Sequence, residues 1–145
     1  MPGLVPPVEL APPPTSVLDA SALLAVVRDE PGATIVVRAI ADGAAVSVFN
    51  WTEVLSVVAA GGDDPRRVPE QLGVHETSGV SVRIESPNSD ECIAIARLRP
   101  TTKPQRLSLA DRACLALASR LGVPALTADR TWADADTGTV VQLIR

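Results

Sequence analysis

Apolar residues recur along this chain either in short unbroken runs or in stripes spaced three or four residues apart. Unbroken runs are typical of buried strands, and the wider spacing is typical of helices with one buried face. The runs predict strands over residues 16–19, 44–49, 79–86, 123–127 and 139–144. The stripes predict helices over residues 20–30, 31–40, 50–60, 88–99 and 108–121. Because strands and helices alternate, we expect a mainly parallel sheet covered by helices on both faces.

Turn-forming residues set the ends of these segments. Pro31 is predicted at the first position of the second helix, where the missing N–H of proline costs nothing. Asp42-Gly43 ends that helix, Gly61-Gly62 ends the third, and Gly122 ends the fifth. The polar stretch over residues 61–73 is broken by prolines and predicts at most a short helix.

The first fifteen residues differ in composition from the rest of the chain. They contain six prolines and lack the basic start of a signal peptide. We therefore expect a disordered tail over residues 1–15 and one domain over residues 16–145. A chain of 145 residues has the length of one ordinary domain with a real core. No stretch approaches the roughly 20 apolar residues of a membrane span, and we expect a cytoplasmic protein.

The overall composition is that of a globular protein, with 46% hydrophobic and 21% charged residues. Aromatic residues make up only 2%, so the core has to consist of Ala, Val, Leu and Ile. The net charge of −4 argues against a protein that coats nucleic acid by general electrostatics. It leaves a nuclease open, because a metal site concentrates acidic residues locally and the bound cation cancels part of their charge.

The two cysteines are interpreted as buried free thiols. Cys92 and Cys114 both lie in apolar helical patterns, and they show no CxxC spacing. Cys92 belongs to a stripe on the helix over residues 88–99 that also contains Ile95, Ala96 and Leu98. A reducing compartment is therefore favoured over one that forms disulfides.

Four carboxylates lie inside or just beyond otherwise apolar segments, where an ionised group is costly unless something pairs with it. They are Asp19, Glu53, Asp111 and Asp129. Asp19 ends the first strand, Glu53 follows the second, and Asp129 lies two residues after the strand over 123–127. Ligand sites in open α/β sheets gather at the carboxyl ends of strands. Four acids spread over the chain but meeting at that edge indicate a shared cation.

Each acid also has a purely structural explanation. The segments NWTE (50–53) and SLAD (108–111) have the spacing of a capping box or a close variant of it. Asp129 would cap a short turn over the next three residues. Asp19 is harder to explain this way, because Ser21 already offers a cap for the following helix. Capping explains the acids one by one but leaves their coincidence unexplained.

Carboxylates without histidine or cysteine partners suit a hard cation such as Mg²⁺, or Mn²⁺, and not zinc. Such an ion can activate water and neutralise charge on a phosphodiester during in-line attack. The hydroxyls of Ser21 and Thr127 lie close in sequence to these acids and are expected to orient them. The sequence therefore predicts metal-dependent hydrolysis of a phosphodiester.

Other chemistries are poorly supported. His75 is the single histidine and lies in a polar loop, which argues against catalysis based on histidine. The chain has no glycine-rich phosphate loop of the nucleotide-binding types and no nucleophile elbow around a serine.

A run of basic residues without an intervening acid begins at the end of the fourth predicted helix and continues into the loop after it. It contains Arg97, Arg99, Lys103 and Arg106, and Arg112 extends it. One interpretation is a solvated helix end and loop. The other is a surface that contacts the phosphates of RNA and offsets the acidity of the protein.

Three segments together resemble the PIN-domain ribonucleases of the VapC toxin type. They are VLDASALLAVVRDEPGA, VFNWTEVL and LSLADRACLALASRLGVPALTADRTW, and the resemblance runs from Ser16 to the C-terminus. By motif position, Asp19, Glu53, Asp111 and Asp129 correspond to the acidic cluster of the family. Ser21 and Thr127 correspond to its supporting polar residues. The proline-rich start and the stretch over residues 61–89 depart from the family pattern.

The resemblance implies a three-layer α/β/α sandwich around a five-stranded parallel sheet. It also implies a Mg²⁺-dependent endoribonuclease that acts on tRNA or another structured RNA. A homodimer inhibited by a cognate antitoxin is expected, with the antitoxin's C-terminal segment across the active site. Two alternatives stay open: a PIN nuclease of RNA processing without a toxin role, and a catalytically dead PIN fold that only binds.

Overall fold

The computed structural model describes residue 3, residues 12–74 and residues 82–145. The expected disordered tail over 1–15 therefore lies mostly outside the described residues. His75 and residues 79–81 of the predicted third strand lie outside them as well. In the described part of the chain, no helix is long and apolar enough to cross a membrane.

Five parallel strands form one sheet in the described residues, in the order β3-β2-β1-β4-β5. The strands are β1 (Ser16–Leu18), β2 (Ala44–Ser47), β3 (Val82–Glu85), β4 (Ala125–Thr127) and β5 (Val141–Leu143). This confirms the predicted parallel sheet and the approximate position of each strand. β1 lies at the centre, so residues that follow it stand between those that follow β2 and β4.

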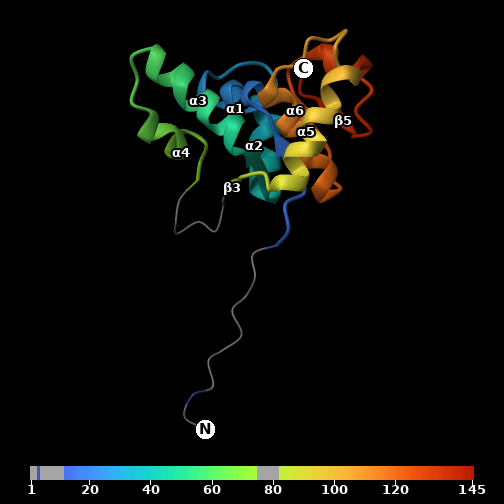
Figure 1. Ribbon diagram of the computed structural model, residues 1–145. Helices are drawn as coiled ribbons and strands as arrows, with labels where there is room; N and C mark the ends of the chain where they lie inside the picture. Colours follow the sequence, from blue (N-terminus) through green and yellow to red (C-terminus); the bar gives the residue numbers. More distant parts are fainter. Residues whose placement is uncertain (1–2, 4–11, 75–81) are drawn as a thin grey trace.

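The helices alternate with these strands as predicted (Figure 1). The α-helices are α1 (Ala20–Val27), α2 (Ala33–Asp42), α3 (Val48–Ala60), α4 (Val68–Gln71), α5 (Ser89–Thr101) and α6 (Leu109–Leu121). Two short 3₁₀ helices are η1 (Pro65–Arg67) and η2 (Arg130–Asp134). The polar stretch over 61–73 contains only η1 and α4, which confirms that it forms no long helix.

Neighbouring residues of each strand face opposite layers, because side chains alternate across a sheet. Leu18 and Val46 pack with residues of α1, α2 and α3 in one cluster of buried side chains. Val17 and Ala45 pack with α6 on the other face. Both layers are built mainly from Ala, Val, Leu and Ile, although Trp132 is the largest fully buried side chain. The result is the expected three-layer sandwich.

Two helices begin at residues other than those predicted. Pro31 lies in a turn, and α2 begins at Ala33 after Gly32, whose φ of 94° is left-handed. A Cβ at Gly32 would also lie 2.5 Å from the carbonyl oxygen of Ile144, so this close approach requires glycine. α3 begins at Val48, two residues early, because the buried Ser47 hydroxyl accepts the Phe49 N–H at 3.3 Å.

The buried face of α5 is also rotated from the predicted one. Glu91 and Ile95 are buried and Leu98 is half-buried, whereas Cys92 and Ala96 are exposed. Glu91 can be buried because Arg120 of α6 pairs with it. The prediction of two buried thiols is therefore wrong for Cys92. It is right for Cys114, which is fully buried.

Candidate acidic site

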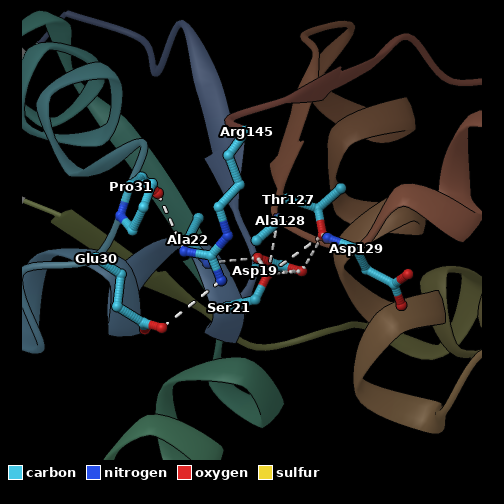
Figure 2. Close-up of polar contacts among 9 residues, drawn as sticks. All are labelled: Asp19, Ser21, Ala22, Glu30, Pro31, Thr127, Ala128, Asp129 and Arg145. Carbon is cyan, nitrogen blue, oxygen red and sulfur yellow. Dashed lines mark hydrogen bonds and ion pairs between the residues drawn. The ribbon is translucent and has the colours of Figure 1, made fainter.

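Asp19 is held by three hydrogen-bond donors at the end of the central strand (Figure 2). One carboxylate oxygen accepts the Ala22 N–H at 2.8 Å, and the other accepts the Thr127 hydroxyl at 2.5 Å. The Ser21 hydroxyl lies 2.7 and 2.9 Å from the two oxygens and donates to them. Asp19 is itself the N-cap of α1, so the expectation that Ser21 would cap this helix is wrong.

Hydrogen bonds of the same two hydroxyls connect the turn after β4 with the first turn of α1. The Ser21 oxygen accepts the Ala128 N–H at 2.9 Å, and the Thr127 oxygen accepts the Asp129 N–H at 3.0 Å. Each hydroxyl thus donates to Asp19 and accepts from the backbone after β4. Asp19 is only 3% exposed, and its carboxylate is fixed from several sides.

Asp129 caps η2, as its structural explanation predicted. One of its carboxylate oxygens accepts the backbone N–H of Thr131 at 2.9 Å and the hydroxyl of Thr131 at 2.7 Å. In Figure 2 the Asp129 carboxylate lies away from that of Asp19. Its second oxygen is therefore the one that remains for a ligand.

Asp111 forms a complete capping box with Ser108 at the start of α6. Its carboxylate accepts the Ser108 N–H at 2.9 Å, and the Ser108 hydroxyl accepts the Asp111 N–H at 3.1 Å. Since α6 leads directly into the parallel strand β4, its first turn lies at the carboxyl edge of the sheet. The capping explanation is correct, and it places Asp111 at the same edge as Asp19.

Glu53 lies in the second turn of α3 and is exposed. The helix begins after Ser47, so NWTE (50–53) forms no capping box. Asn50, interpreted from the sequence as its cap, is instead fully buried. Its amide has no hydrogen-bond partner in the described residues. The capping-box spacing led to Asn50 being interpreted as a helix cap and not as a buried polar residue.

The pKa values of Asp19, Glu53 and Asp111 are raised by burial and by neighbouring acids, and Asp111 links the group. Burial raises the pKa of Asp19 to about 6, against the hydrogen bonds it accepts, and the charge of Asp111 adds to the rise. Burial and then Asp111 raise the pKa of Glu53. The pKa of Asp111 is raised by burial and by Asp129, although hydrogen bonds from Ser108 oppose the rise. These couplings show that the four acids share one electrostatic environment.

Basic groups compensate the charge of this cluster only in part, through the Arg112 guanidinium, which lowers the pKa of Asp111. None of the ion pairs in the described residues includes any of the four acids. Beneath the cluster, burial and then the charges of Asp19 and Asp111 raise the pKa of the Cys114 thiol well above its ordinary value. Across residues 12–74 and 82–145, negative charge thus accumulates at this edge without an ion-paired basic side chain.

The donor set fits a hard divalent cation bound partly through water. All candidate ligands are carboxylate oxygens, which Mg²⁺ and Mn²⁺ prefer. Within the part of the chain that the structure describes, no three acidic, cysteine or histidine side chains lie close enough to hold an ion directly. Mg²⁺ commonly keeps several waters and takes only one or two carboxylates. The arrangement therefore suits a hydrated ion.

The basic run divides into a surface part and a buried residue. Arg97, Arg99, Lys103 and Arg106 are exposed, and the last three line one surface pocket. Arg112 does not extend this surface, because it is only 9% exposed and donates to the carbonyl of Ile95 at 2.9 Å. The loop that carries Lys103 and Arg106 leads into Ser108, so the basic pocket lies just before the turn that holds Asp111.

Comparisons with known proteins agree with this fold. The family model described as PIN domain matches residues 16–138. A toxin-antitoxin complex from Klebsiella pneumoniae has a chain of similar structure, with 19% identity, a TM-score of 0.69, and 90% of this chain and 98% of that chain covered. VapC20 of Mycobacterium tuberculosis, described as a Sarcin-Ricin loop cleaving toxin, is 16% identical with a TM-score of 0.61, covering 86% and 96%.

VapBC2 of Rickettsia felis, solved with a DNA fragment from its promoter, is 11% identical with a TM-score of 0.65, covering 88% of this chain and 97% of that one. At these identities the similarity concerns the fold. A search of curated proteins found no match.

Proposed function

Since this chain belongs to the PIN domain family, whose pattern spans residues 16–138, we propose that it is a metal-dependent endoribonuclease. It would use Mg²⁺, or Mn²⁺ in its place, to hydrolyse phosphodiester bonds of RNA. The observation that carries the proposal is the buried Asp19, which Ser21, Thr127 and Ala22 hold but no cationic side chain of the described residues pairs with. A preset carboxylate of this kind suits a metal ligand.

The residues of the site would have different roles in binding the cation. Asp19 and Asp111 hold the cation directly, and Glu53 and Asp129 complete its shell or coordinate it through water. The bound cation supplies charge neutralisation at the phosphodiester and a lowered pKa of attacking water. Ser21 and Thr127 keep Asp19 in one rotamer, so that little has to be reorganised when the ion binds.

We further propose that this ribonuclease is the toxin of a type II toxin–antitoxin pair. The support is the fold shared with the toxin-antitoxin chain of K. pneumoniae and with VapC20 of M. tuberculosis. The substrate would be tRNA or another structured RNA, and a cognate antitoxin would inhibit the enzyme. A homodimer acting in the cytoplasm completes the proposal.

Induced expression of the wild type beside Asp19→Asn tests this function. The wild type is expected to arrest growth and to create new 5′ ends in sequenced RNA, whereas the variant does neither. Equal growth and identical RNA profiles for the two proteins would exclude the toxin. RNA cleavage without growth arrest would instead identify a processing nuclease. Metal binding without cleavage of any RNA would identify a binding module.

The exposed basic residues are proposed to hold the RNA backbone. Replacing Arg99, Lys103 and Arg106 with Ala should raise KM about 10- to 100-fold at moderate salt and leave kcat nearly unchanged. If each residue neutralises one phosphate of single-stranded RNA, the slope of log affinity against log salt should fall by about 2 in total. Filter binding of a catalytically inactive form, over a salt series, measures this slope.

The matched control removes three other exposed arginines, Arg28, Arg38 and Arg67, which lie at the end of α1, on α2 and on η1. This variant has the same net charge but should keep the salt slope of the wild type. Equal losses in both triple variants would show that only the total charge matters and that the pocket has no specific role.

A further inference from the structure

Asn50 is the third residue of α3 and is fully buried. Neither its side-chain oxygen nor its side-chain nitrogen has a hydrogen-bond partner in the described residues. Burying an amide in this state costs free energy that a leucine of similar size would not. A buried polar group without a partner is best explained by a water or an ion that completes its bonding.

The position of Asn50 relates it to the acidic site. The register between β1 and β2 pairs Val17 with Ala45, so the chain beyond Leu18 and that beyond Val46 leave the sheet side by side. α3 therefore begins beside Asp19. On α3, Asn50 continues the buried stripe of Val54 and Val58.

Glu53 lies about 60° from Asn50 around the same helix, one turn further along. After burial, the charge of Asp111 on α6 is the second cause that raises the pKa of Glu53. The helices α3 and α6 pack against each other. Asn50 therefore lies on the buried side of the first turn of α3, a helix that packs against both α1 and α6.

We propose that Asn50 is a positioning residue for the cation of the acidic site. With the cation bound, its Nδ2 would donate to a water that bridges to a carboxylate of the cluster, and its Oδ1 would accept a hydrogen bond from a water that the cation carries. This inference rests on the proposed metal-dependent function. An amide suits the role because it donates and accepts at once, whereas another carboxylate would add negative charge to four acids that form no ion pair in the described residues.

Asn50→Leu tests the inference with two measurements. In EDTA, the melting temperature of the variant should equal or exceed that of the wild type, because an unpaired buried amide has been removed. The Kd for Mn²⁺, measured by electron paramagnetic resonance, should rise about 10-fold or more, as it does when groups that support metal ligands are lost. The kcat for RNA should fall, and KM should change little.

Ser16→Ala is the matched control. The Ser16 hydroxyl is also buried without a partner in the described residues, but it lies at the opposite end of β1 from Asp19. Its removal should leave the melting temperature unchanged or raised and the Mn²⁺ affinity unaltered. The pair of variants therefore separates relief of an unpaired group from loss of a metal-site contact.

The outcomes that contradict the inference are distinct. If the wild type binds Mn²⁺ and Asn50→Leu binds it equally well, Asn50 has no role at the cation and the proposed function stands. A marked fall in the melting temperature of Asn50→Leu in EDTA would show that the amide has a structural partner and would also overturn the inference. If the wild type itself binds no Mn²⁺, the metal-dependent function and this inference both fail.

Discussion

Replacing Asp19 with Asn is expected to abolish RNA cleavage and, at neutral pH, to make the metal-free protein more stable. The loss of activity should exceed roughly 100-fold, the upper end for removing a group that only supports a metal ligand. The gain in stability follows from burial, which raises the pKa of Asp19 to about 6. At neutral pH Asp19 is ionised, and its buried charge destabilises the folded state relative to the protonated or neutral side chain.

The size and sign of this effect follow from the two pKa values of Asp19. A rise of its pKa from the ordinary value of 3.8 to about 6 corresponds to about 3 kcal/mol of unfolding free energy lost at neutral pH. The stability that protonation of Asp19 contributes is fully present below pH 3.8 and is lost as the pH rises through about 6. The free energy of unfolding of the variant should therefore exceed that of the wild type by about 1 to 3 kcal/mol at pH 7.5. Its advantage should shrink as the pH falls toward 4.

Urea unfolding in EDTA at several pH values measures the difference. Asp63→Asn is the control for loss of one negative charge, because Asp63 is exposed in the turn after α3. It should be close to the wild type throughout the pH range. If Asp19→Asn is less stable than the wild type at pH 7.5, the contribution of Asp19 as a helix cap outweighs the cost of burying its charge.

The arrangement of strands and helices could be predicted from the sequence because local signals agreed with one another. The helix over 108–121 had a capping box at one end and Gly122 at the other, and the structure has both. Asp19, Ser21 and Thr127 could be selected because polar residues interrupted apolar strand ends. Their hydrogen bonds then required only that β1 and β4 be neighbours.

Features that depend on distant partners could not be predicted in this way. Glu91 is separated by 29 residues from Arg120, whose ion pair allows it to be buried, so α5 was assigned the wrong inner face. Glycine is required at position 32, just before α2, because the backbone there is left-handed and approaches Ile144 near the other end of the chain. Local signals also gave a wrong helix start at Asn50. The segment NWTE (50–53) has the spacing of a capping box, but α3 begins two residues earlier, at Val48.

Addition of Mn²⁺ is expected to reverse the order of stability between the wild type and Asp19→Asn. At 1,000 times its Kd, a ligand that binds only the folded state stabilises it by about 4.1 kcal/mol, which exceeds the advantage of about 1 to 3 kcal/mol expected for the metal-free variant. The wild type should thus gain several degrees in melting temperature at pH 7.5, and dialysis against EDTA should remove the gain. Asp19→Asn should gain little, because it lacks the carboxylate that compensates the ion.

The affinity for Mn²⁺ should also depend on pH, because the cation and a proton compete for Asp19. With a pKa of about 6 for Asp19, the Kd should be nearly constant above pH 7. Below pH 6 it should rise roughly tenfold per pH unit if one proton is displaced. Electron paramagnetic resonance between pH 5 and 8 measures this dependence. A melting temperature that Mn²⁺ leaves unchanged at pH 7.5 would mean that the four carboxylates form no cation site and that Asp19, Asp111 and Asp129 serve only as caps.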